Sequence, residues 1–238
     1  MSVAAFEVIH SDNHLLVLNK PAGLLTQDSG SGRPNLEEMA RELVRREKGR
    51  NGAVFLHCVH RIDRLVSGLV LFARTSKALA RLQSAPAQQA MTKTYCAAVE
   101  GRMPDAAGTL TDWLEHGDHH ARVVPASSGR GKKSVLHYRV LADSGSGQCL
   151  EITLETGRYH QIRAQLAAAG CPIVGDRRYG SHHRTGEGIS LHHLRLRLRH
   201  PVGNLPLTFV AATVLGHAPH PDQAAFTDCV SLLASAAP

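Results

Sequence analysis

The sequence predicts an α+β fold with a mixed, mainly antiparallel sheet and a few helices. Many short apolar or alternating runs are typical of strands, whereas three stretches carry helical spacing. Short connectors rich in glycine and serine separate many of the strand candidates, which favours antiparallel pairing. Because strands and helices do not alternate along the chain, α+β fits better than a βαβ arrangement.

The first strands flank a turn. Residues 6–9 and 14–19 are expected to pair across the turn-prone sequence Ser11-Asp12-Asn13. Residues 27–34 contain several glycines and serines, which indicates a mobile loop. Further strands are expected at residues 69–73, 93–99, 109–114, 121–124, 135–141, 150–154, 191–199 and 206–211.

Three helices are expected between these strands. Asn35 predicts a helix N-cap, and Glu38 is placed as its capping-box partner. Ser76 opens a second helix, which Pro86 should stop because proline lacks a backbone N–H. The third helix covers residues 161–169 and ends at a glycine in the C′ position.

The strand at residues 191–199 alternates leucines with arginines. Arg195, Arg197 and Arg199 would share one face of it. That face could bind a row of phosphates, or it could be an ordinary solvated face, and both interpretations stay open. The end of the chain, residues 218–238, is a tail of unassigned role behind a main domain at residues 1–217.

Composition is that of a globular protein, and its positive charge favours a polyanionic partner such as nucleic acid, although many basic proteins bind no polyanion. The chain has 238 residues, a formal charge of +7 and 43% hydrophobic residues. Five scattered cysteines without a C-x-x-C pair indicate a reducing, cytoplasmic compartment. We see neither a membrane span nor a secretory signal in the sequence, so no membrane partner is expected.

Sixteen histidines gather in several small groups. Zinc binding is one interpretation of these groups, and a zinc hydrolase would be the corresponding function. The groups lack H-E-x-x-H and paired-cysteine spacing, so surface and loop histidines are the other interpretation, and no metal site is assigned.

The sequence from His60 to Gly68 sets one carboxylate between two arginines at a loop-to-strand junction. Asp63 lies between Arg61 and Arg64, and flanking cations favour its charged form. A salt-bridged surface turn would have the same composition as a reactive carboxylate on a rigid scaffold. The motif alone leaves these two interpretations open.

A second dense stretch, from Thr156 to Arg163, lies at a strand-to-helix junction. Arg158, His160 and Arg163 fall near one turn, where they could hold a carboxylate or a phosphate. A capped helix end with surface arginines is the alternative.

Five blocks in order resemble the RluA-like family of RNA pseudouridine synthases, and they cover residues 6–211. The blocks are His14 to Gly23, His60 to Gly68, Lys93 to Gly101, Gly157 to Arg163 with Gly175-Asp176, and Leu191-His192 leading to His200-Pro201. The resemblance implies a sheet in two halves with a central basic cleft. It also implies isomerisation of uridine to pseudouridine in ribosomal or transfer RNA, without a cofactor.

By the same resemblance, Asp63 is the catalytic aspartate, Tyr95 stacks on the target base, and Arg163 pairs with the aspartate. Arg61 helps to displace the base, and Leu191 packs beside the pocket. We assign Arg64, Arg158 and His160 to substrate binding as well. One departure is the pair Leu65-Val66, where many members carry small acidic or polar residues; we place this pair in a loop that faces RNA.

The resemblance implies chemistry on the ribose, by attack of the aspartate at C1′ or by removal of the C2′ proton. The sequence does not decide between these routes, nor does it indicate an oligomeric state. An RNA-binding module without catalysis is a further alternative, but it leaves the aspartate, tyrosine and arginine unexplained.

Overall fold

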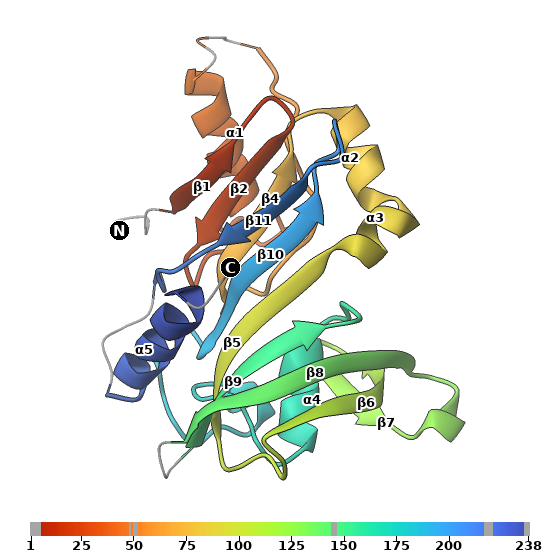
Figure 1. Cartoon of the computed structure of the whole chain (residues 1–238), viewed down its shortest axis with the longest axis vertical. Helices are drawn as coiled ribbons and strands as arrows, with labels where there is room; N and C mark the ends of the chain where they lie inside the picture. Colours follow the sequence, from red (N-terminus) through yellow and green to blue (C-terminus); the bar gives the residue numbers. More distant parts are fainter. Residues whose placement is uncertain (1–5, 48, 50–51, 144–146, 217–220, 236–238) are drawn as a thin grey trace.

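An eleven-stranded sheet runs through the protein in the computed structural model, which describes residues 6–47, 49, 52–143, 147–216 and 221–235 (Figure 1). The strand order is β1-β2-β4-β10-β5-β9-β8-β6-β7, with β11 paired to β10 and β3 to β4. The strands are β1 (Glu7–Ser11), β2 (Leu15–Lys20), β3 (His57–Cys58), β4 (Ser67–Ala73), β5 (Thr92–Glu100), β6 (Ala107–His116), β7 (Ala121–Val124), β8 (Lys132–Asp143), β9 (Gly147–Leu154), β10 (Leu191–Arg199) and β11 (Pro206–Val210).

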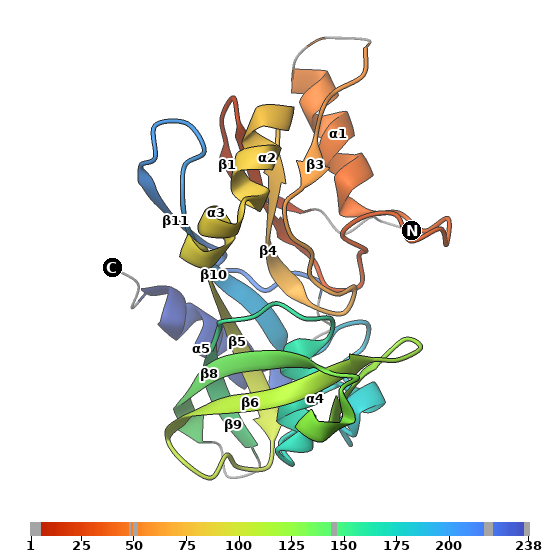
Figure 2. The same ribbon diagram turned by 90° about the vertical axis from the view of Figure 1, so that its right-hand side faces the viewer.

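Five helices and two short 3₁₀ turns lie within the described residues. They are α1 (Leu36–Glu47), α2 (Ser76–Gln83), α3 (Ala85–Ala90), α4 (Gln161–Ala168), α5 (Pro221–Ser235), η1 (Ala126–Ser128) and η2 (Arg177–Tyr179). Figure 2 shows two halves, one with α1 to α3 and the other with α4, that meet along β5 and β10. The predicted α+β class with a mainly antiparallel sheet is confirmed, because β4 and β10 are the parallel pair among otherwise antiparallel named strands. The basic cleft between the halves stays a prediction.

One hydrophobic cluster spans both halves of the sheet. Phe72 of β4 in the first half and Ile152 of β9 in the second belong to it, together with Tyr95 and Leu191 near the middle. A shared core of this kind fixes the two halves relative to each other, because interiors pack as densely as organic crystals.

The helix boundaries agree with the predictions at one end of α2 and differ at the other. The predicted start at Ser76 is confirmed, and Thr75 caps the helix, since its side chain accepts from the N–H of Ala78. Pro86 does not simply stop that helix but lies in the first turn of α3, where a missing N–H costs nothing. The Asn35 cap is confirmed by a 3.0 Å bond from the N–H of Glu38 to its Oδ1.

Helix α5 lies within the stretch that the sequence left unassigned. Phe226, Val230 and Leu233 are buried against the sheet beside Cys96 of β5 and Leu194 of β10. The helix therefore covers part of the sheet. It is not long and apolar enough to cross a membrane, and neither is any other described helix.

The α5 helix bears on both interpretations of the arginine strand. Arg195 is 9% exposed and donates to the carbonyl of Leu233 at 3.0 Å. Its side chain is therefore engaged under α5, so neither a phosphate track nor a solvated face is made of all three arginines. Arg197 and Arg199 are exposed.

The parallel pair β4 and β10 is packed tightly. Ser67 pairs with His192 and Gly68 with His193. Gly68 has φ of +113°, and a Cβ atom at this position would overlap the backbone of His193. The Ser67 hydroxyl donates to His192 Nδ1 at 2.8 Å, while His192 Nε2 donates to the carbonyl of Ala211 at 2.8 Å. The close approach of the two strands therefore requires a glycine at position 68.

We expect Gly68→Ala to lower the free energy of unfolding by about 3 kcal/mol or more, because it adds a steric overlap to an unfavourable φ. Gly129→Ala is the matched control, since Gly129 also has positive φ but has no atom within 4 Å of the added Cβ. It should cost about 1 kcal/mol. Urea denaturation measures both, and equal losses would contradict the tight approach of β4 and β10.

Candidate active site

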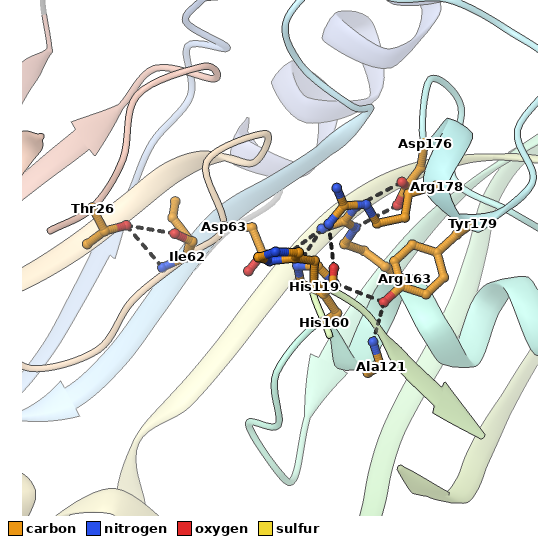
Figure 3. Close-up of polar contacts among 10 residues, drawn as sticks. All are labelled: Thr26, Ile62, Asp63, His119, Ala121, His160, Arg163, Asp176, Arg178 and Tyr179. Carbon is orange, nitrogen blue, oxygen red and sulfur yellow. Dashed lines mark hydrogen bonds and ion pairs between the residues drawn. The ribbon is translucent and has the colours of Figure 1, made fainter. Parts of the chain in front are cut away.

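A buried arginine connects two carboxylates at the centre of the protein. Arg163, on α4, is 3% exposed and donates from Nε and Nη2 to Asp176 at 2.6 and 2.9 Å. Its Nη1 donates to Asp63 Oδ2 at 3.0 Å (Figure 3). Burial opposes the charge on the guanidinium, but the hydrogen bonds to Asp176 and Asp63 outweigh burial and raise the pKa of Arg163. The predicted pairing of Arg163 with Asp63, 100 residues apart in sequence, is therefore present in the structure.

Asp63 lies in the turn between β3 and β4. The hydroxyl of Thr26 donates to the carbonyl of Ile62 at 2.7 Å, and the N–H of Val66 donates to the carbonyl of Asp63 at 3.1 Å. These bonds hold the backbone on both sides of the carboxylate. Arg163 anchors the Asp63 side chain, which is 25% exposed and is therefore accessible from solvent.

His160 lies against the same guanidinium, in the left-handed backbone conformation with φ of +52°. Because arginine only donates, the 2.8 Å contact with Arg163 Nη1 makes His160 Nε2 an acceptor. The proton is then on Nδ1, which faces the Tyr179 hydroxyl at 2.9 Å. Burial, and next the charge of Arg163, lowers the pKa of His160 to about 3, so the ring is neutral.

Tyr179 connects this cluster to the second half of the sheet. Its hydroxyl accepts from the N–H of Ala121 at the start of β7, at 2.8 Å. The Arg163 guanidinium carbon lies 4.9 Å from the centre of the Tyr179 ring, in a cation–π arrangement. Arg178 donates to the carbonyl of His119, so the turn η2 holds the β6–β7 hairpin beside the site (Figure 3).

Tyr95 and Leu191, the two predicted apolar residues of the site, are buried in one hydrophobic cluster. They lie on neighbouring strands, β5 and β10, and are 6% and 3% exposed. Burial, and next the negative charge of Asp63, raises the pKa of the Tyr95 phenol. Tyr95 is therefore protonated at neutral pH, and the charge of Asp63 is close enough to affect its pKa.

A buried lysine supports the loop that carries Asp63. Lys20 is fully buried, and its Nζ donates to the carbonyls of Pro21 at 2.8 Å, Leu24 at 2.7 Å and Arg64 at 3.3 Å. Burial lowers the pKa of Lys20 to about 7, and the charge of Asp63 opposes this shift. Lys20 thus holds the opening sequence block against the residue that follows Asp63.

The remaining predicted site residues are on or near the surface. Arg61 and Arg158 are exposed, and Arg64 is half-buried with its guanidinium 3.4 Å from the carbonyl of Gly23. None of the three forms an ion pair with Asp63 among the described residues. His160, in contrast, is buried beside the carboxylate.

Val66 departs from the expectation for the Leu65-Val66 pair. It is 2% exposed and belongs to the core cluster that contains Tyr95 and Leu191. The prediction that this pair faces RNA is therefore wrong for Val66, whose side chain packs inward.

Three residues that hold the site together were not assigned a role from the sequence: Asp176, Tyr179 and Lys20. Asp176 and Lys20 were part of the recognised blocks, and an acidic residue so close after the arginine block was the available signal. Tyr179 carried no such signal, because its contacts come from elements distant in sequence.

Several histidines of the groups noted in the sequence form hydrogen bonds within the fold. His182 Nδ1 lies 2.9 Å from Glu100, and His192 bridges Ser67 and Ala211. Within the described ranges, no three side chains of histidine, cysteine, aspartate or glutamate are arranged to hold a metal ion.

Comparison with known proteins identifies the family. A family model described as RNA pseudouridylate synthase matches residues 14–168. The ribosomal large subunit pseudouridine synthase D of Zymomonas mobilis is 31% identical over 217 residues, which cover 86% of this chain and 68% of that protein. The uncharacterized RNA pseudouridine synthase YhcT of Bacillus subtilis is 30% identical over 198 residues, or 82% of this chain and 65% of that protein. The chain thus spans about two thirds of the length of these relatives.

Solved structures share the fold. Human RNA Pseudouridylate Synthase Domain Containing 4 superposes with a TM-score of 0.73 at 21% identity, over 95% of this chain and 93% of that chain. Human RNA Pseudouridylate Synthase Domain Containing 1 gives 0.70 at 18% identity, over 100% and 98%. The resemblance drawn from the five sequence blocks is confirmed, and the chain belongs to the RNA pseudouridylate synthase family.

Proposed function

We propose that this protein isomerises specific uridines to pseudouridine in structured RNA, with Asp63 acting on the ribose of a flipped-out uridine. The observation that carries the proposal is the 3.0 Å contact between Arg163 and a carboxylate that is 25% exposed. A buried guanidinium holds this carboxylate in place, and its exposure leaves it available to a substrate.

The proposed reaction is an isomerisation within one nucleotide. The bond from uracil N1 to ribose C1′ breaks, a bond from C5 to C1′ forms, the C5 proton leaves, and N1 gains a proton. Atoms and electrons balance without an external oxidant, reductant or group donor. Asp63 begins the reaction by attack at C1′ or by removal of the C2′ proton, and both routes use the ionised form.

The other predicted residues surround this carboxylate. Tyr95 stacks on the uracil ring and takes part in proton transfer at C5, while Leu191 packs beside the base. Arg61 helps to displace the target base from its stack, and Arg64 and Arg158 bind phosphates, because all three carry a charge at or near the surface. His160, neutral and fixed by Tyr179, accepts from Arg163 and so helps to hold the guanidinium that contacts Asp63.

Ribosomal RNA is the proposed substrate. The relatives from Zymomonas mobilis and Rickettsia conorii are named ribosomal large subunit pseudouridine synthases D and C. A ribosomal substrate also fits the cytoplasmic location expected from the cysteines. Mapping pseudouridine in total RNA, with and without the protein, tests this choice; sites confined to transfer RNA would replace it.

We expect Asp63→Asn to lower the rate of isomerisation by about 10²-fold or more, since the amide cannot act as a base or a nucleophile. Release of tritium from RNA labelled at uridine C5 measures the rate, in the presence of excess chelator. Asp105→Asn, at an exposed carboxylate, is the control and should keep the wild-type rate. Survival of tritium release in Asp63→Asn would contradict the role of Asp63, and loss of wild-type release in chelator would favour a metal enzyme.

Tyr95→Phe should fold and bind RNA with an affinity near that of wild type but turn over slowly, because it keeps the ring and loses the hydroxyl. Single-turnover tritium release separates the chemical step from binding. Tyr138→Phe changes another buried tyrosine and serves as the control. Equal rates for Tyr95→Phe and wild type would remove the phenol from proton transfer.

Asp176→Asn should reduce kcat by about 10- to 100-fold while the RNA affinity changes little. Asp176 does not need to touch substrate for this effect, because it holds the Nε edge of Arg163 and so orients Nη1 toward Asp63. Steady-state kinetics with a defined RNA measures kcat and KM. A change confined to KM would place Asp176 in substrate binding instead.

A further inference from the structure

His193 lies where three strands of the sheet meet. It is fully buried on β10, its Cα is paired with that of Tyr95 on β5, and it is also paired with Gly68 on β4. Directly opposed residues on neighbouring strands point to the same face and contact each other. His193 therefore lies between the strand of the proposed catalytic tyrosine and the strand that follows Asp63.

The imidazole of His193 stacks on the Tyr95 ring. The ring centres are 4.5 Å apart and the ring planes differ by 16°. The half-buried imidazole of His60 packs edge-on against His193, with ring centres 5.2 Å apart and ring planes at 73°. Parallel stacking at this distance limits tilting of the Tyr95 ring, because its inner face is covered by a ring that is itself held in place.

A hydrogen bond fixes the His193 ring. The distance from Nδ1 to the carbonyl oxygen of Leu69 is 2.7 Å, and a carbonyl only accepts, so Nδ1 carries the proton. Burial lowers the pKa of His193 to about 3, which keeps the ring neutral. Leu69 belongs to β4, two residues after Ser67, where this strand begins. The ring that supports Tyr95 is thus attached to the strand that the Asp63 turn enters.

We propose that His193 is a positioning residue for the isomerisation: its ring sets the plane of Tyr95 relative to Asp63. The inference rests on the proposed function and adds a residue that does not contact the substrate. Two contacts define it, the stack on Tyr95 and the hydrogen bond to Leu69, and they can be separated by substitution.

His193→Phe keeps an aromatic ring behind Tyr95 and removes the hydrogen bond, whereas His193→Asn keeps a donor toward Leu69 and removes the ring. Single-turnover tritium release gives the rate of the chemical step, and a filter-binding titration gives the RNA Kd. Rates are divided by the folded fraction from urea denaturation, so loss of stability alone does not count as loss of positioning.

We expect His193→Asn to lower the single-turnover rate by about 10- to 100-fold, since small displacements of catalytic groups carry costs of this size. Its RNA Kd should stay within about twofold of the wild-type value, which separates the chemical step from binding. His193→Phe should keep the rate within about threefold of wild type, because stacking rather than the hydrogen bond sets the ring plane.

The substitution His193→Asn in a Tyr95→Ala background provides the decisive control. Without the Tyr95 ring, His193→Asn should have almost no further effect on the rate, because coupled residues are not additive. Full additivity, a wild-type rate for His193→Asn, or equal losses in the Phe and Asn variants would overturn the proposal. Absence of tritium release from wild type would instead contradict the proposed function itself.

Discussion

The arrangement of the site depends on one buried guanidinium, that of Arg163. Arginine keeps its proton even when buried, so this charge must be compensated by anions and acceptors nearby. Asp176 accepts two hydrogen bonds from Arg163 as a bidentate pair. The other hydrogen bonds of the guanidinium go from Nη1 to Asp63 and His160. Because Asp176 already holds the arginine, the second carboxylate can stay partly exposed and remain available for chemistry.

The sheet explains why these groups can be held with accuracy. Asp63 comes directly before β4, Tyr95 lies on β5, and β10 lies between these two strands with Leu191 and His193. Arg163 comes from α4, in the other half of the molecule (Figures 1 and 2). The ion pair between Asp63 and Arg163 thus joins the two halves, and the common hydrophobic core keeps their separation constant.

Much of the site could be predicted because its main residues stand in short contiguous blocks. The Asp63 turn, the Tyr95 strand and the Arg163 helix were each visible as local patterns, and five blocks in order identified the family. Asp176 and Lys20 were inside those blocks without an assigned role. Tyr179, the inward packing of Val66 and the cover over Arg195 were not predictable, because each depends on a contact with a distant element.

The sequence by itself determined the fold class and most strands and helices. These features follow from local periodicity and turn residues, which act over a few neighbours. The pairing of Asp63 with Arg163 across 100 residues was predicted from the family resemblance alone. The tertiary structure alone decided the tautomer of His160, the ring behind Tyr95 and the burial of Lys20. Such properties arise from desolvation and from hydrogen bonds between elements that are far apart in the chain, and both exist only after the elements have packed.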